Sequence, residues 1–520
     1  MVICFRLRGY KKPRFFVYNI RMKQERFFGI LLPIFSLPSP HGIGTLGKAA
    51  YDFVDFLSAS GAKVWQMLPL NVTSYGDSPY QSPSSKGFNP YFIDLDLLCQ
   101  QGILKEEEIQ DDLLFSDPHY VQYSSLFLHR YVILRKAFSR FDRRSPDFVA
   151  FVQKGEYHDF ALFMTLKAKN HFRSWKEWPI EEQRDSKALE ERLLKDYRED
   201  YEFYLWTQYE FLRQYNALKD YANRKNIRIM GDMPIYVAYD SVDVWKYPEL
   251  FALDEEHNPK MVAGVPPDAF SSDGQLWGNP IYNWSYQKET GYRWFNDRIA
   301  DNLAIFDILR IDHFRGFSAY YEIPYGEDTA RNGHWEDGPK FDLFRDKTEL
   351  PIIAENLGVI DQGVIDLLNE TGYPGMAVTA FAITNLADDD SNKPWNSVVN
   401  EICYTGTHDN EPIYGMLEHM TPEEKDVCLE AVRRCADDCH IADKDDTLDD
   451  LTDTVLRLAF AYPCFGTIIP MGDLLHRGDE ARINFPSRVD GKNWIYRFTK
   501  EDFSSSLAKK IHSWVDEFQR

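Results

Sequence analysis

Four apolar runs of this sequence end in an acidic residue. IRIMGDMP contains Asp232, ILRIDHF contains Asp312, PIIAENLG contains Glu355 and CYTGTHDN contains Asp409. A single acid in such a place is commonly a helix N-cap or a turn residue. Four are harder to explain as caps, because the carboxyl ends of parallel barrel strands converge on one rim. We therefore expect the four carboxyl groups to share one pocket.

Clustered carboxyl groups among aromatic side chains, without a metal-binding motif, are typical of glycoside cleavage. In that chemistry one carboxylate attacks the anomeric carbon and one carboxylic acid protonates the departing oxygen. Arg310 lies two residues before Asp312, so the two side chains share a strand face and the guanidinium would keep the carboxylate ionised. Glu355 follows the apolar run PIIA, and apolar surroundings would raise its pKa, as a general acid requires.

The elements that must position these residues alternate along the chain. Short apolar runs follow amphipathic segments from Met22 onward, which predicts an α/β protein built as a (β/α)8 TIM barrel without a separate C-terminal β-domain. Two regions interrupt the alternation and are expected on the C-terminal face: a helical insertion at about 98–205 and an irregular active-site loop at about 240–295. The eight expected strands are FFGILLPIF, AKVWQMLPL, IRIMGDMPIYV, AIFDILRIDHF, LPIIAENLG, GMAVTAFAI, EICYTGTHD and FGTIIPM.

Composition narrows the possible partners. A net charge of −22 argues against nucleic acid, which needs a basic surface. No apolar run reaches the roughly 18 residues of a membrane-spanning helix.

Seven cysteines are few and odd in number, as expected in a reducing cytoplasm. Cys435, Cys439 and His440 could suggest a metal site, but their acidic surroundings favour a helix and its exit. Aromatic residues make up 15%, which fits either an aromatic core or sugar-binding surfaces.

Residues 1–21 differ from the rest of the chain. They contain six basic residues and no acidic residue. Basic residues interrupt each apolar run, so the segment lacks the apolar centre of a signal peptide. We expect it to be a non-native or upstream-start extension, poorly ordered, ahead of a catalytic barrel at 22–520.

The acid-bearing blocks also resemble a known family. RIDHFRG, AENLG and GTHDN, with GDMPIYV upstream, are similar to blocks of the α-amylase superfamily, in the wording of the 4-alpha-glucanotransferases (amylomaltases, glycoside hydrolase family 77). The resemblance covers 26–498. It implies transfer of α-1,4-glucan segments to the 4-hydroxyl of an acceptor, with retention and a covalent glucosyl-enzyme. It further implies Asp312 as nucleophile, Glu355 as acid/base and Asp409 as transition-state stabiliser.

The same resemblance implies the substrate contacts and the partners. Maltooligosaccharides and α-1,4-glucans would be the substrates, no cofactor or metal is expected, and the oligomeric state is not predicted. His313 is open between substrate contact and strand-end packing, and Arg315 is expected to be a structural ion-pair partner. The substrate-binding residues would be Arg310, His408, Asp232, Ser78, Tyr80 and Asn484 around the cleaved sugar, and Asp268, Phe270, Gln275 and Trp277 on the acceptor side, with His313 undecided.

Some positions depart from the family pattern. Gly472 stands where the family usually has Gln, and Glu411 and Pro412 replace smaller or hydroxyl-bearing residues after THDN. These departures put chain-length and acceptor preference in doubt, but none touches the three catalytic acids. Two alternatives are an amylase-type hydrolase and a non-catalytic glucan-binding protein. The wording of 240–295 argues against the first, and the intact acids argue against the second.

Overall fold

The computed structural model describes residues 25–110, 117–267, 271–486, 488 and 490–520. Its centre is an eight-stranded parallel sheet in the order β10-β11-β12-β1-β2-β3-β6-β9. The backbone N–H of Ala354 donates to the carbonyl of Pro374 at 2.9 Å, which joins the two ends of the sheet and closes it as a barrel. The strands are β1 Phe27–Leu31, β2 Val64–Gln66, β3 Arg228–Met233, β6 Ile308–Ile311, β9 Ile352–Ala354, β10 Gly375–Val378, β11 Glu401–Tyr404 and β12 Gly466–Pro470.

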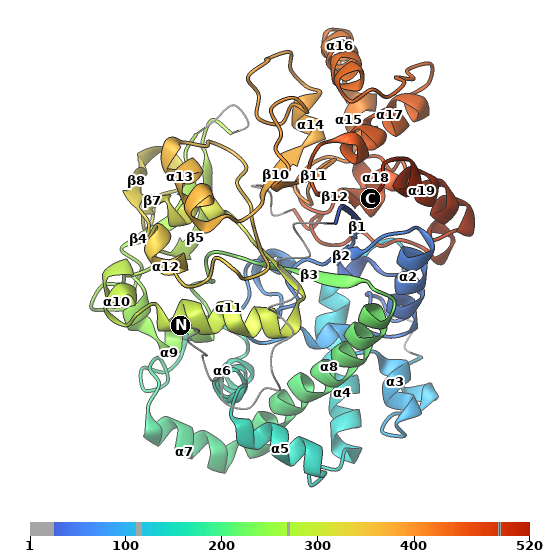
Figure 1. Ribbon diagram of the computed structural model, residues 1–520. Coiled ribbons are helices and arrows are strands. Elements are labelled where there is room, and N and C mark those ends of the chain that lie inside the picture. The colour runs from blue at the N-terminus through green and yellow to red at the C-terminus, as the bar shows by residue number, and fades with distance from the viewer. Residues whose placement is uncertain (1–24, 111–116, 268–270, 487, 489) are drawn as a thin grey trace, which may run out of the picture.

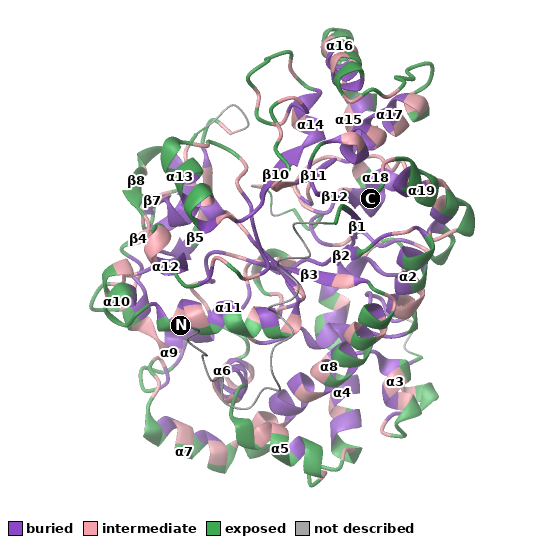
Figure 2. Cartoon of the chain, in the orientation of Figure 1, coloured by how far each residue is buried: buried purple, intermediate pink, exposed green. Residues whose placement is uncertain are grey.

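All eight strands coincide with predicted apolar runs, so the predicted barrel is confirmed. Almost every strand residue is buried, because helices cover the outer face of the barrel and side chains fill its centre. Gly231 in β3 shows how closely they pack: a Cβ there would lie 2.0 Å from the ring of Phe306. Figure 2 shows these buried strands beside outer helices whose outward faces are exposed.

Helices connect the strands and extend the molecule on one side. Residues 98–205, where a helical insertion was expected, contain α4 to α7 and the start of the long α8, at the bottom of Figure 1. The helices are α2 Lys48–Ala59, α3 Leu95–Gln100, α4 Tyr123–Arg140, α5 Pro146–Lys154, α6 His158–Lys169, α7 Lys187–Asp196, α8 Arg198–Arg224, α9 Val242–Lys246, α10 Trp284–Glu289, α11 Arg293–Ile305, α12 Phe341–Phe344, α13 Gln362–Thr371, α14 Thr379–Ala382, α15 Ile413–His419, α16 Pro422–Asp438, α17 Leu448–Ala461, α18 Met471–Leu474 and α19 Ser505–Glu517.

Many aromatic residues belong to the core. Phe138, Phe203 and Trp206 pack ring against ring between α4 and α8, with Trp206 completely buried. Trp65 and Trp175 are also fully buried. A large part of the aromatic excess therefore stabilises the fold, as the first of the two interpretations supposed.

A second sheet was not predicted. Four antiparallel strands in the order β5-β4-β7-β8 lie beside the barrel: β4 Met261–Val265, β5 Gln275–Pro280, β7 Ala319–Pro324 and β8 His334–Asp337. The region 240–295, expected to be irregular, supplies β4 and β5. These strands escaped notice because β5 contains Gly278 at φ +77° and ends in Pro280, while every residue of β8 is exposed.

Within the described ranges, no helix is both long and apolar enough to span a membrane. Residues 1–21 lie outside the described part of the chain.

Candidate active site

Neighbouring barrel strands hold the backbones of the predicted acids together. The N–H of Asp312, just after β6, donates to Met233 O of β3 at 3.0 Å. The N–H of Glu355, just after β9, donates to Ile311 O of β6 at 3.0 Å. The strand ladder therefore continues into the segments that carry the predicted acids, and it fixes Asp312 and Glu355 side by side on one rim.

Arg310 is a positively charged residue on this rim that contacts two of the predicted acids. Its Nη1 donates to Asp232 Oδ2 at 2.6 Å and to Asp312 Oδ1 at 3.0 Å. The hydroxyl of Tyr80 donates to the same Asp232 oxygen at 2.8 Å. Among the described residues, no donor pairs with Asp232 Oδ1, although this oxygen is buried. Burial acts to lower the pKa of Arg310, but Asp232 and Asp312 raise it well above its usual value, so the guanidinium stays charged.

Glu355 is held by two backbone donors. Its Oε2 accepts the N–H of His313 at 2.7 Å and its Oε1 accepts the N–H of Leu357 at 2.7 Å. His313 has left-handed backbone angles, φ 49° and ψ 48°, which few non-glycine residues adopt. This turn, which directly follows Asp312, brings the amide of His313 to Glu355. Such strained backbone is common at functional sites.

Burial controls the protonation of both carboxyl groups. It raises the pKa of Glu355, as predicted for a general acid, with Arg310 and the two backbone donors opposing the rise. Burial also raises the pKa of Asp312 well above its usual range, and Arg310 counteracts only part of that rise. The predicted Arg310 contact is present, but in the free protein it does not depress the Asp312 pKa below that of an ordinary aspartate.

Asp409 belongs to a second group of contacts on the same rim. Asn484 Nδ2 donates to Asp409 Oδ1 at 2.6 Å, and His408 Nε2 lies 3.5 Å from the same oxygen. The ring of Tyr80 stacks on that of His408 with centroids 5.2 Å apart. Tyr80 therefore contacts both Asp232 and His408, and it links the Arg310 cluster to the Asp409 cluster.

The other predicted binding residues that the structure describes lie in two places, one beside Tyr80 and one beside His313. Ser78 Oγ accepts the N–H of Tyr80 at 3.2 Å, which fixes the turn that presents Tyr80. The indole of Trp277 meets the His313 ring edge to face at 4.9 Å and donates to Gln275 Oε1 at 3.0 Å. The structure thus brings Trp277 and Gln275 to the Glu355 side of the rim. Asp268 and Phe270, predicted on the acceptor side, lie outside the described residues.

His313 and Arg315 differ in their surroundings. Burial, with the nearby Arg315 cation, lowers the pKa of His313 to about 3, so its imidazole is neutral at pH 7. Arg315 pairs with Asp361 at 3.1 Å and lies over the ring of Trp335 at 3.9 Å. These contacts agree with the structural role expected of Arg315.

Arg482 was missed by the sequence analysis. Its Nη2 donates to the carbonyl of Asp409 at 2.9 Å and its Nε donates to the carbonyl of Asn484 at 3.0 Å. The side chain therefore ties together two segments that hold predicted substrate contacts. A basic residue two positions before Asn484 in EARIN was the available signal, but sequence alone does not show that it turns back to the Asp409 loop.

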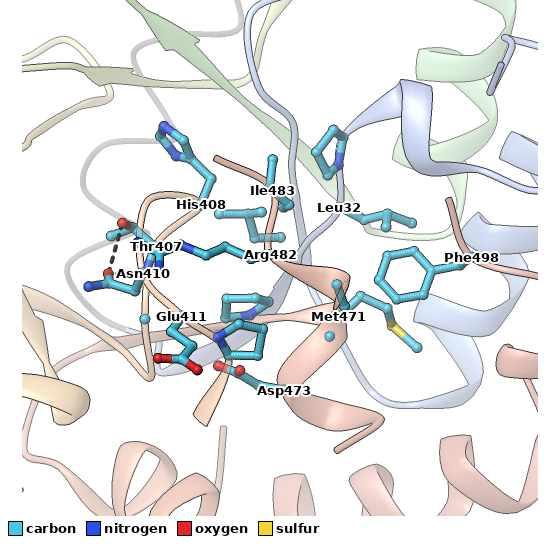
Figure 3. A pocket seen from close by; sticks show the side chains of 17 residues that line it. Leu32, Thr407, His408, Asn410, Glu411, Met471, Asp473, Arg482, Ile483 and Phe498 are labelled. Carbon is cyan, nitrogen blue, oxygen red and sulfur yellow. Dashed lines mark hydrogen bonds between the residues drawn. The ribbon is translucent and has the colours of Figure 1, made fainter. Parts of the chain in front are cut away.

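A small hollow lies next to the Asp409 loop. Its lining includes Thr407, Glu411, Asp473 and Arg482, and Figure 3 shows Arg482 extending toward the Thr407–Asn410 turn. Gly472 contributes to this space, because an added Cβ would meet only Ala481, at 3.7 Å. The departure at Gly472 therefore leaves room next to the loop that carries Asp409.

We expect Arg482→Met to reduce kcat on maltotriose about 10- to 100-fold with a smaller change in KM, because Asp409 would lose its fixed position. Steady-state kinetics measure both constants. Arg477→Met is the matched control, since Arg477 pairs with Asp502 and does not contact Asp409. A kcat for Arg482→Met within twofold of the control would contradict a positioning role.

Comparison with known proteins gives the family. The glycoside hydrolase 77 model, described as 4-alpha-glucanotransferase, matches residues 32–502. The chain belongs to the 4-alpha-glucanotransferase family. It is 41% identical to a 4-alpha-glucanotransferase of Clostridium butyricum, over 92% of this chain and 98% of that protein. It is 38% identical to that of Thermus thermophilus, over 96% and 100%.

A solved structure agrees with this assignment. The amylomaltase of Streptococcus agalactiae in complex with acarbose is 41% identical and has a TM-score of 0.90, over 95% of this chain and 100% of that one. The family resemblance and the barrel fold are thus confirmed. As a 4-alpha-glucanotransferase, the protein acts as an enzyme on α-1,4-glucans.

Proposed function

We propose that the chain transfers maltooligosaccharide segments by a retaining double displacement. Asp312 attacks C1 of the donor sugar while Glu355 protonates the departing 4-oxygen, which leaves a covalent glucosyl-enzyme. Glu355, now ionised, then takes the proton from the 4-hydroxyl of an acceptor glucan. The acceptor oxygen attacks C1, and the bond to Asp312 breaks. Each donor bond broken is replaced by one equivalent bond.

The contrast between the two carboxyl groups carries this assignment. Asp312 is bonded to a charged guanidinium and its side chain is 27% exposed, so it has both a counter-ion and room for a sugar. Glu355 is buried, and both of its carboxyl oxygens accept a backbone N–H on the adjacent strand end. Burial raises the pKa of both carboxyl groups, so the counter-ion and the exposure of Asp312, rather than the pKa, distinguish the two. A nucleophile needs the first environment and a general acid needs the second.

The surrounding residues support a glucan substrate. Asp409 would hold hydroxyls of the distorted sugar, and the acarbose complex of the Streptococcus agalactiae relative supports binding of a maltooligosaccharide-like ligand. No nucleic acid or membrane partner is proposed. The remaining contacts to the cleaved sugar would come from Arg310, Asp232, Tyr80, Ser78, Asn484 and His408, and those to the acceptor from Gln275, Trp277 and His313, with Asp268 and Phe270.

We also propose that residues 22–520 act as one catalytic unit in the cytoplasm. The six cysteines that the structure describes are all free, which supports a reducing compartment.

Incubation of the purified protein with maltotriose tests the proposal. We expect a ladder of longer maltooligosaccharides together with released glucose, because two maltotrioses rearrange to maltopentaose and glucose. Chromatography of the products over time separates transfer from hydrolysis. Glucose and maltose without any longer chain would instead identify an amylase-type hydrolase.

A further inference from the structure

Three metal-ligating side chains converge on one face of the antiparallel sheet. Glu322 of β7 lies directly opposite His334 of β8, and Glu336 is two residues further along β8 on the same face. His334 Nε2 is 3.2 Å from Glu322 Oε1 and 3.4 Å from Glu336 Oε1. The sheet backbone therefore holds one imidazole between two carboxylates.

These distances fit a coordination sphere. Zinc binds histidine nitrogen and carboxylate oxygen at about 2.0–2.2 Å, so neighbouring donors of a tetrahedral site lie roughly 3.3 Å apart. The two measured separations fall on either side of that value, and the three donor atoms all lie within 4.8 Å of one another. Two of the three donor-to-donor separations thus match those of neighbouring ligands on one ion.

Charge and access also favour a cation. Glu322 and Glu336 place two carboxylates around one imidazole, and a bound cation would offset their like charges. Glu322 is nearly buried, with a 13% exposed side chain, whereas His334 and Glu336 are half exposed. One ligand is therefore rigid, and the other two leave a path for an ion and for water.

We propose that Glu322, His334 and Glu336 form a divalent transition-metal site of the zinc type, with water as fourth ligand. The ion would join the edge strand β8 to β7. On the opposite face of β8, Trp335 packs on Arg315, which donates to the Val359 carbonyl and pairs with Asp361. By holding β8 in place, the ion would therefore stabilise the contacts that connect Trp335, through Arg315, to the segment after Glu355.

No local sequence pattern indicates this site, because its ligands come from two strands joined by residues 325–333. The candidate it did suggest is different. Cys435 is completely buried within α16, where burial raises the pKa of its thiol to about 11, and Cys439 ends that helix. This placement agrees with the reading of Cys435, Cys439 and His440 as a helix and its exit.

Titration of the chelator-treated full-length protein with Zn²⁺ and Co²⁺ tests the proposal. We expect isothermal titration to give one zinc equivalent that is lost, or bound about 10- to 100-fold more weakly, in His334→Ala and in Glu336→Gln. Bound Co²⁺ should show the intense visible bands of tetrahedral coordination. Saturating zinc should also raise the Tm of the wild type by a few degrees.

His419→Ala is the matched control, because within the described ranges His419 pairs with one carboxylate alone, that of Glu411, at 2.7 Å. This variant should bind zinc as the wild type does. Equal stoichiometry and affinity in the wild type and His334→Ala would overturn the proposal. So would a wild-type Tm that saturating zinc leaves unchanged.

Discussion

Asp312→Asn is expected to abolish glucan transfer, by more than about 10⁴-fold, while glucan binding persists. The amide cannot form the covalent intermediate, and losing a nucleophile removes the whole reaction path. The amide oxygen can still accept from Arg310, whose Nη1 lies 3.0 Å from Asp312 Oδ1 in the wild type. The variant should therefore fold normally and keep its substrate contacts.

Initial rates on maltotriose and calorimetric titration with acarbose would measure the two effects separately. Asp361→Asn makes the same chemical change in a carboxylate that pairs with Arg315, outside the catalytic group. That control should transfer glucan at close to the wild-type rate. Residual turnover of Asp312→Asn within about tenfold of the wild type would exclude Asp312 as the nucleophile.

Glu355→Ala is expected to reduce transfer from maltotriose about 10²- to 10⁴-fold, because the departing sugar would leave without a proton. A donor whose leaving group needs no proton should escape this loss. With α-maltotriosyl fluoride, the first step of the variant should stay within about tenfold of the wild type. Fluoride release and product chromatography follow the two reactions.

Alanine is the better substitution at Glu355 for a structural reason. Both carboxyl oxygens accept a backbone N–H, from His313 and from Leu357, so a glutamine NH₂ would face one of these donors. That clash would leave a buried donor unsatisfied, at a cost of about 1–3 kcal/mol. The rate of a glutamine variant would then reflect this structural cost as well as the loss of the acid. If the fluoride and maltotriose reactions slow equally in Glu355→Ala, Glu355 does not act as the acid.

The barrel could be predicted because its strands are buried on both faces. Such strands read as continuous apolar runs, and β6 or β12 is recognisable without any knowledge of its neighbours. Each residue of the edge strand β8, HWED, is exposed to some extent and the strand has no apolar face, so its pairing with β7 depends on tertiary contacts that no local pattern records.

The position of the acids proposed as catalytic could be predicted for the same reason, since Asp312 and Glu355 directly follow those strands. The environment of these acids could be predicted less well from the sequence. The Asp312 pKa depends on how completely the surrounding loops exclude water, and that burial outweighs the adjacent Arg310. Tyr80 is 152 positions from Asp232, and Arg482 is 73 positions from Asp409. Such contacts follow from the folded loops rather than from spacing along the chain.

The unpaired oxygen of Asp232 has a consequence for selectivity. A sugar hydroxyl that donated to this buried oxygen would satisfy it. A deoxy sugar could not supply that donor. A site that hydrogen-bonds a substrate hydroxyl rejects the analogue without that hydroxyl far more strongly than an apolar pocket rejects a sugar of slightly different size. A glucose with the matching hydroxyl would thus supply to Asp232 a hydrogen bond that none of the described residues supplies.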